Sequence, residues 1–120
     1  MRDLHFSYDA EGDVLYIAFD KGRKASSVSL NDHIILRFDA HTGEAIGLTL
    51  LDFSQLASTD QGLPLSRLVE FPAELRTKVW AILNSPPVSH YLHIVSPVDT
   101  HTPTASLARQ LSLAELLLVA

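Results

Sequence analysis

Five short segments with strand-like patterns, separated by clusters of turn-forming residues, fill the first half of the chain. In most of them apolar and polar residues alternate, the period of two that is typical of a β-strand with one buried face. The connections are too short to hold a crossover helix, so neighbouring strands are expected to run antiparallel. The sequence therefore predicts an antiparallel β-meander over residues 3–51, with strands near 4–8, 14–19, 26–30, 34–38 and 46–50.

The hydrophobic period changes in the second half of the chain. Leu75, Val79 and Ile82 fall on one face of a helix that the pattern predicts over residues 72–84. A Thr-Pro pair is typical of a helix start and begins a second predicted helix over residues 103–119. We expect both helices to cover one face of the predicted sheet.

A sixth strand is predicted at residues 90–95, where His90 and His93 stand among apolar neighbours in a strand-like order. Residues three apart face opposite sides of a strand, so these two histidines are not expected to share a metal ion. The strand is expected either at the edge of the sheet or paired across a dimer. The chain of 120 residues is thus predicted to be a single α+β domain, with the meander over 1–56 and an extension over 57–120.

The chain contains no cysteine, which excludes disulfides, thiolate metal sites and cysteine nucleophiles. Its formal net charge of −5 disfavours a nucleic-acid backbone or an anionic membrane as the main partner. No apolar stretch approaches the roughly twenty residues that a membrane-spanning helix needs, and the start does not resemble a signal peptide. A cytoplasmic location is therefore expected.

Three carboxylates lie close together in one predicted turn. Asp9, Glu11 and Asp13 are candidate ligands for a hard cation such as Ca²⁺ or Mg²⁺. A calcium-binding loop would continue with further oxygen ligands and a glycine, whereas this run enters the apolar strand at Val14. A solvated turn is the favoured interpretation, and no cofactor is predicted.

A second loop combines carboxylates with an imidazole. Asp39, His41 and Glu44 are candidate catalytic residues, because such a pair can act in general acid–base catalysis. Turn formation is the competing interpretation, since Asp and Gly are common turn residues. The sequence patterns of the serine-hydrolase elbow, the phosphate-binding loop and the dinucleotide-binding loop are absent.

The one basic cluster is formed by Lys21, Arg23 and Lys24 at a predicted hairpin tip. These side chains are candidate contacts to a nucleic-acid phosphate. They lie in the acidic half of the chain, and a solubilising turn is the favoured interpretation.

The end of the chain is its most apolar stretch. Consecutive apolar residues there point in every direction around a helix, so one buried face cannot accommodate them all. A partner chain would cover the excess, and packing on the core of the same chain is the alternative. The candidate interface residues are Leu113, Leu116, Leu117, Leu118 and Val119.

An ordered set of residues in the first half forms a pattern of its own. The set comprises Tyr8-Asp9, Glu11, Asp13, Val14 to Ile17, Leu36, Phe38-Asp39, Gly43, Ile46 to Leu48 and Leu50 to Ser54. It resembles the YuzE-like small bacterial proteins, the domain-of-unknown-function family numbered 2283, over residues 6–56. The chain departs from the family pattern at Arg37, His41 and Thr49.

The resemblance implies a compact β-rich fold without an established activity. Some family members lie beside small toxin-like genes, which implies an antitoxin-like or protein-binding role. The leading hypothesis is therefore a non-enzymatic interaction protein that forms a homodimer or binds a small protein partner. The alternatives are a small hydrolase-like or metal-assisted enzyme that uses the Asp and His loop residues, and a nucleic-acid-associated regulator.

Overall fold

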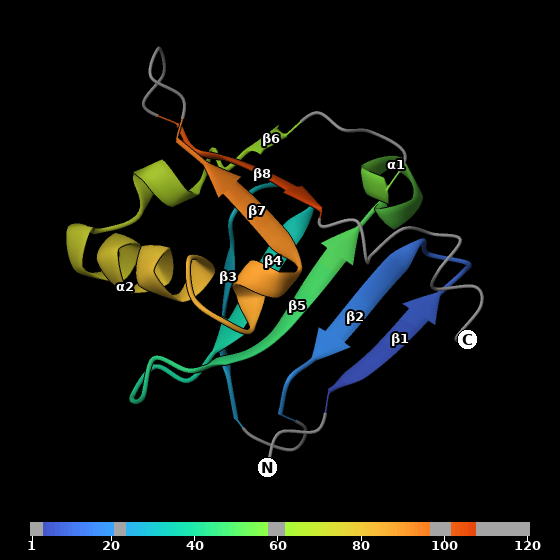
Figure 1. Ribbon diagram of the computed structural model, residues 1–120, viewed down its shortest axis with the longest axis horizontal. Helices are drawn as coiled ribbons and strands as arrows, with labels where there is room; N and C mark the ends of the chain where they lie inside the picture. Colours follow the sequence, from blue (N-terminus) through green and yellow to red (C-terminus); the bar gives the residue numbers. More distant parts are fainter. Residues whose placement is uncertain (1–3, 21–23, 58–61, 97–101, 108–120) are drawn as a thin grey trace.

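The computed structural model describes residues 4–20, 24–57, 62–96 and 102–107. Figure 1 shows a larger antiparallel sheet with a smaller sheet and the helices arranged over it. This arrangement confirms the predicted α+β class.

Five antiparallel strands form the larger sheet, as the sequence predicts. They are β1 (His5–Asp9), β2 (Val14–Ala18), β3 (Ser26–Ser29), β4 (Ile34–Phe38) and β5 (Ala45–Leu51). Their spatial order is β1-β2-β5-β4-β3, which differs from the order of a simple meander. Strand β2 does not pair with β3, because β5 lies between β2 and β4 and pairs with both.

Gly47 lies in the middle of this central strand, where a glycine is typical of a bulge or of a close backbone approach. A Cβ atom at this position would lie 2.8 Å from the carbonyl oxygen of Ile17 on β2. The register between β4 and β5 also shifts beside it, between Arg37 and Phe38. The close backbone approach and the register shift are therefore both present. Because glycine has no side chain, β2 and β5 can pair at this point.

A second, smaller sheet comes entirely from the second half of the chain. It contains β6 (Leu63–Pro64), β7 (Leu92–Val95) and β8 (Thr104–Leu107) in the order β6-β8-β7. The strand predicted at 90–95 is confirmed as β7, but it pairs with β8 rather than with the edge of the larger sheet.

The helix predicted over residues 103–119 is wrong at its start, because residues 104–107 form β8. Pairing with β7 satisfies the backbone of this segment, and Ala105 is buried in the core. Tertiary pairing and burial therefore override the local helix signal. Residues 108–119 of that prediction lie outside the described residues.

Two α-helices and two 3₁₀ helices complete the described structure. The helix predicted over 72–84 is confirmed as α2 (Ala73–Leu83), and the others are α1 (Phe53–Ala57), η1 (Leu68–Glu70) and η2 (Val88–His90). No helix within the described ranges is long and apolar enough to cross a membrane.

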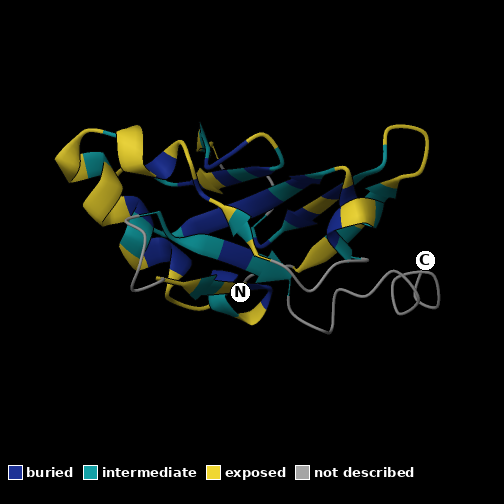
Figure 2. Ribbon diagram, turned by 90° about the horizontal axis from the view of Figure 1, so that it is seen from above, coloured by how far each residue is buried: buried dark blue, intermediate teal, exposed yellow. Residues whose placement is uncertain are grey.

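One cluster of apolar side chains connects the larger sheet with the elements that cover it. Leu15, Leu36 and Leu48 enter the cluster from the sheet, Leu83 enters it from α2, and Ala105 enters it from β8. The helix and the second sheet therefore lie on the same face of the larger sheet. Figure 2 shows the buried residues along the middle of the molecule, with exposed residues concentrated on loops and outer helix turns.

Candidate functional site

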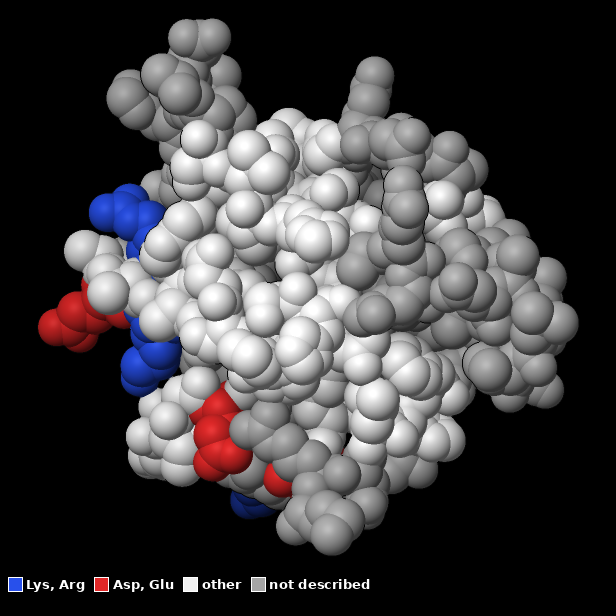
Figure 3. Space-filling view, in the orientation of Figure 1, with Lys and Arg blue, Asp and Glu red and all other residues white. Residues whose placement is uncertain are grey.

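A groove of about 590 Å³ opens between α2, η1 and one end of the second sheet. Cavities of roughly 300–1,000 Å³ are the usual size for ligand sites in proteins. On the face shown in Figure 3, the described charged side chains lie near the left and lower margins, and the centre is uncharged. The groove is lined by Leu68, Val69, Arg76, Thr77, Trp80, Ser96, Thr102 and Pro103.

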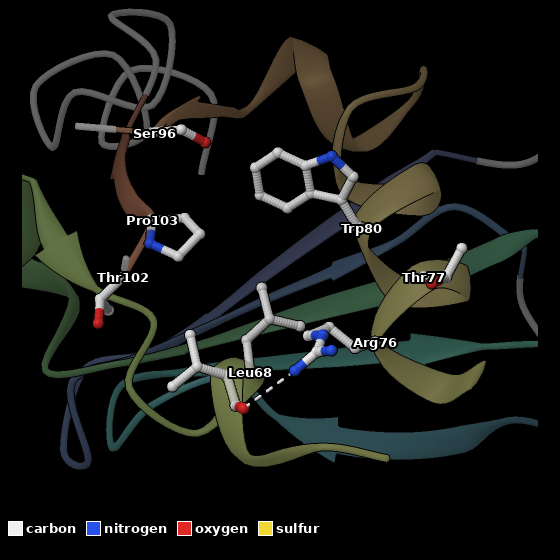
Figure 4. Close-up of a pocket in the computed structure, with 8 residues that line it drawn as sticks. Leu68, Arg76, Thr77, Trp80, Ser96, Thr102 and Pro103 are labelled. Carbon is white, nitrogen blue, oxygen red and sulfur yellow. Dashed lines mark hydrogen bonds between the residues drawn. The ribbon is translucent and has the colours of Figure 1, made fainter. Parts of the chain in front are cut away.

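Arg76 and Trp80 bring a cation and a large aromatic ring to the same groove (Figure 4). The indole of Trp80 points across the groove toward Pro103, and the guanidinium of Arg76 points toward η1. Arg76 Nη1 donates a hydrogen bond of 3.3 Å to the carbonyl oxygen of Val69. The arrangement can hold an apolar group and place a negative group beside it.

The packing of α2 explains why these two side chains face the groove. Val79 and Leu83 are fully buried and fix the inner face of the helix against the core. Residues four apart are neighbours on a helix surface, so Arg76 and Trp80 share the flank beside that face. The N–H of Leu65 donates a 2.8 Å hydrogen bond to the carbonyl oxygen of Pro103, which fixes the opposite wall.

A second polar centre connects the first hairpin to the end of β5. The carboxylate of Asp13 accepts hydrogen bonds from the Tyr8 hydroxyl at 2.7 Å and from the Ser54 hydroxyl at 2.5 Å. It also accepts the backbone N–H of Ser54, at 3.0 and 3.2 Å from its two oxygens. The Phe53 N–H donates to the Asp13 carbonyl at 3.0 Å, so Asp13 caps the start of the short helix α1 from another part of the chain.

These hydrogen bonds shift two pKa values in opposite directions. Hydrogen bonds from Ser54, and then from Tyr8, lower the pKa of Asp13 because they favour its charged form. The hydrogen bond to Asp13 raises the pKa of Tyr8, because the phenol must keep its proton to donate it. The hydrogen bonds from Tyr8 and Ser54 to Asp13 join β1, β2 and α1, so we interpret this polar centre as a structural joint.

The three candidate metal ligands separate in the structure. Asp9 Oδ1 accepts a 3.1 Å hydrogen bond from the Glu11 N–H within the turn, whereas Asp13 turns toward Ser54. In the part of the chain that the structure describes, no group of three or more His, Asp or Glu side chains could hold a metal ion.

The candidate catalytic residues form a turn of their own between β4 and β5. Asp39 Oδ1 accepts hydrogen bonds from the backbone N–H groups of His41 at 2.8 Å and Thr42 at 3.1 Å. The Asp39 N–H donates to the carbonyl oxygen of Glu44 at 2.8 Å, and Gly43 takes a φ of 75° to close the turn. The structure therefore brings these residues together as a turn.

The two acidic turns lie at opposite ends of the sheet. Asp13 lies beside the Leu51 end of β5, and Glu44 immediately precedes its Ala45 end. Seven residues of strand separate these ends, a length of roughly 20 Å. The acidic and histidine candidates therefore do not converge on one pocket.

The remaining predicted sites lie mostly outside the described residues. Lys24 is exposed just before β3, whereas Lys21 and Arg23 lie outside the described ranges. The five candidate interface residues of the C-terminal segment, from Leu113 to Val119, also lie outside them.

One further acid–base pair was not predicted from the sequence. His33 Nδ1 lies 3.1 Å from Asp52 Oδ2, without the alignment of a hydrogen bond. Neither residue lines the groove. Sequence spacing gave no signal for this pair, because the two residues meet only where β4 pairs with β5.

The groove was also not predicted from the sequence, although the wall that Arg76 and Trp80 form follows from their spacing. The four-residue spacing of Arg76 and Trp80 within the predicted helix already places them side by side. The opposite wall, formed by residues before β8, could not be found because that segment was predicted to be helical.

The outer face of the larger sheet also carries exposed apolar residues. Tyr16 on β2 is 46% exposed and pairs with Thr49 on β5, which in turn pairs with Ile35 on β4. The neighbouring Val14 and Leu51 are half-buried. These residues alternate with the core-facing ones and so point away from α2 and the second sheet.

The segment that forms the larger sheet matches a known protein family. Residues 5–54 match the family model DUF2283, which is described as a protein of unknown function. No curated protein and no solved structure matches the chain significantly. The matched segment runs from the start of β1 to Ser54, and so includes all five strands and the Asp13–Ser54 joint. Residues 5–54 of this chain therefore belong to the domain-of-unknown-function family 2283.

Proposed function

We propose that this protein is a non-enzymatic protein-binding module whose groove takes a large apolar side chain of a partner protein. The observation that carries the proposal is the groove of about 590 Å³, in which Leu68, Trp80 and Pro103 present apolar surface. Aromatic residues in pockets are typical anchors of protein interfaces, because they bury a large apolar area.

The placement of the acidic residues also favours binding over catalysis. Asp13, Asp39 and Asp9 accept hydrogen bonds from the turns or helix start beside them. Asp9, Asp13 and Asp39 do not line the groove, and among the described lining residues Arg76 alone is charged. Binding of an apolar side chain needs no acid or base in the groove, so this placement of the acids is compatible with a binding role.

A pair of short peptides tests the proposal. Both are blocked by an acetyl group and a terminal amide and differ only in their last residue, leucine or serine. We expect the leucine peptide to change the fluorescence of Trp80, the sole tryptophan of the chain, and to bind with a dissociation constant in the ~mM range. The serine peptide is expected to bind at least tenfold more weakly, because it buries less apolar surface.

Two variants locate the binding, with backbone amide shifts as the readout. Trp80→Ala is expected to abolish the shifts at residues 68–80, whereas Tyr16→Ala, an exposed aromatic position on the other face, is expected to retain them. Equal responses to the two peptides, or shifts that persist in Trp80→Ala, would overturn the proposal.

A second candidate function is homodimerisation through the outer face of the larger sheet. Strand pairing gives this face a basic row with His5 and Arg37 at one end and a row with Asp9 at the other. A twofold axis in the sheet plane and perpendicular to the strands would place His5 of one copy over Asp9 of the other. Tyr16→Glu is expected to dissociate such a dimer in sedimentation equilibrium. A wild-type protein that is still monomeric at ~100 μM would exclude the dimer, because stable dimers typically have lower dissociation constants.

A further inference from the structure

We infer that the groove recognises the C-terminal residue of a partner protein, with its apolar side chain against Trp80 and its free α-carboxylate at Arg76. The inference rests on the proposed function, because it specifies the ligand of the same groove. It follows from the charge, the hydrogen bonding and the spacing of these two residues.

Arg76 is the one charged residue among the described residues that line the groove. Its described polar contact is a hydrogen bond to a neutral acceptor, the carbonyl oxygen of Val69 at 3.3 Å. An arginine has five N–H donors, so this contact leaves donors of the guanidinium available to a ligand. A carboxylate is the group that a guanidinium binds most specifically, through two parallel hydrogen bonds.

The spacing of the two residues selects the kind of carboxylate. Arg76 and Trp80 are four residues apart on α2, so their Cβ atoms are separated by roughly 5–6 Å. A terminal residue carries its side chain and its α-carboxylate on the same Cα atom and can therefore reach both. An internal acidic residue would need a neighbouring residue to supply the apolar side chain, which requires a longer ordered segment.

The walls of the groove agree with a ligand that has an apolar side chain. Leu68 and Pro103 approach from the side opposite the indole of Trp80 (Figure 4), whereas the hydroxyl residues Thr77 and Ser96 lie at the rim. An extended peptide could leave along this rim, while its last side chain fills the apolar centre.

Two peptides that differ in one chemical group test the inference. One ends in leucine with a free carboxylate, and the other is the terminal amide described above. We expect the free acid to bind wild-type protein about tenfold more tightly by calorimetry and by Trp80 fluorescence. Raising the salt concentration is expected to reduce this difference, because the Arg76 guanidinium is exposed to solvent and its attraction to a carboxylate is screened.

Arg76→Gln is expected to remove the difference between the two peptides while binding of the amide stays unchanged. Lys78→Gln is the matched control, because Lys78 is on the same helix and contacts the carbonyl oxygen of Ala40 outside the groove. Circular dichroism and the Tm of each variant check that it folds, which both exposed positions should permit.

The outcomes separate this inference from the proposed function. Tenfold tighter binding of the free acid that depends on Arg76 and not on Lys78 supports it. Equal binding of acid and amide overturns the C-terminal specificity and leaves the apolar groove as a binding site. Binding of neither leucine peptide overturns both.

Discussion

Asp13 accepts hydrogen bonds from both the backbone N–H and the hydroxyl of Ser54, which lies forty-one residues further along the chain. The pair fixes the turn between β1 and β2 to the point where β5 ends and α1 begins. Asp13 has a φ of 56°, and Asp52 beside Ser54 has a φ of 54°, so both segments turn sharply at this joint. The residues of the joint belong to the segment that matches the family, which gives that pattern a structural reason.

Removing the Ser54 hydroxyl should raise the pKa of Asp13 toward its ordinary value. The hydrogen bond from Ser54 is the largest cause of the lowered pKa, so Ser54→Ala should shift it more than Tyr8→Phe does. The carboxyl ¹³C resonance of Asp13, followed by pH titration in the three proteins, measures both shifts. An unchanged midpoint in Ser54→Ala would contradict the assignment.

The same pKa shift contributes to the acid stability of the protein. Because the pKa of Asp13 is lower in the folded than in the unfolded state, the ionised group stabilises the fold above its unfolded pKa. This contribution is lost as the pH falls through the lower, folded pKa, in the range below about pH 4. Tm measured from pH 6 to pH 2 should therefore fall less steeply in Asp13→Asn than in the wild-type protein.

Gly47→Ala should destabilise the sheet by ~3 kcal/mol, because the added Cβ would meet the Ile17 carbonyl oxygen at 2.8 Å. Gly43→Ala is the comparison, since a Cβ there meets no atom within 4 Å and costs only the positive φ, about 1 kcal/mol. Urea unfolding gives both values. A Gly47→Ala variant as stable as Gly43→Ala would show that β2 and β5 can separate locally without loss.

Asn31→Asp should cost about 2 kcal/mol, because it exchanges one buried donor for an acceptor. Asn31 Oδ1 accepts the N–H groups of His33 and Ile34, and an aspartate keeps both bonds. Its Nδ2 donates to the Pro64 carbonyl at 3.0 Å, and this bond would be lost. Asn84→Asp, which removes an exposed amide donor at the C-cap of α2 and places a negative charge there, should cost no more than about 1 kcal/mol.

Leu65→Ala should lower the free energy of unfolding by ~2–5 kcal/mol, because the side chain is fully buried between the two sheets. Fluorescence of Trp80 and circular dichroism of the sheet should report the same shifted midpoint if both halves form one cooperative domain. Ser66→Ala, at the exposed next position, is the control. Two separate transitions would contradict the single-domain prediction.

The sequence predicts the strands of the larger sheet well because each strand depends on the pattern of residues that are neighbours along the chain. The alternation through Ile34, Leu36 and Phe38 and the turn at Gly43 belong to neighbouring residues, and the structure contains both. The pairing of β2 with β5 has no such local cause. It depends on the fit of Ile17 against Leu48 and Gly47, residues that are thirty positions distant along the chain.

The candidate site could be predicted only in part for the same reason. Arg76 and Trp80 are neighbours by helix spacing alone, whereas Pro103 reaches the groove only because β8 pairs with β6 and β7. A Thr-Pro pair can begin either a helix or a strand, and the choice here is made by the backbone partners that β7 offers to Thr104 and Leu107. Local propensity alone therefore cannot predict whether this segment forms a helix or a strand.

The position of β5 has a consequence for the newly made chain. Strands β1 and β2 can form one hairpin, and β3 and β4 another, before β5 leaves the ribosome. Until Leu51 has emerged, the inner edges of both hairpins present unpaired N–H and C=O groups, which are the templates for mispairing between chains. Insertion of this single strand covers both edges in one event, so the nascent protein passes its period of greatest aggregation risk when residues 45–51 arrive.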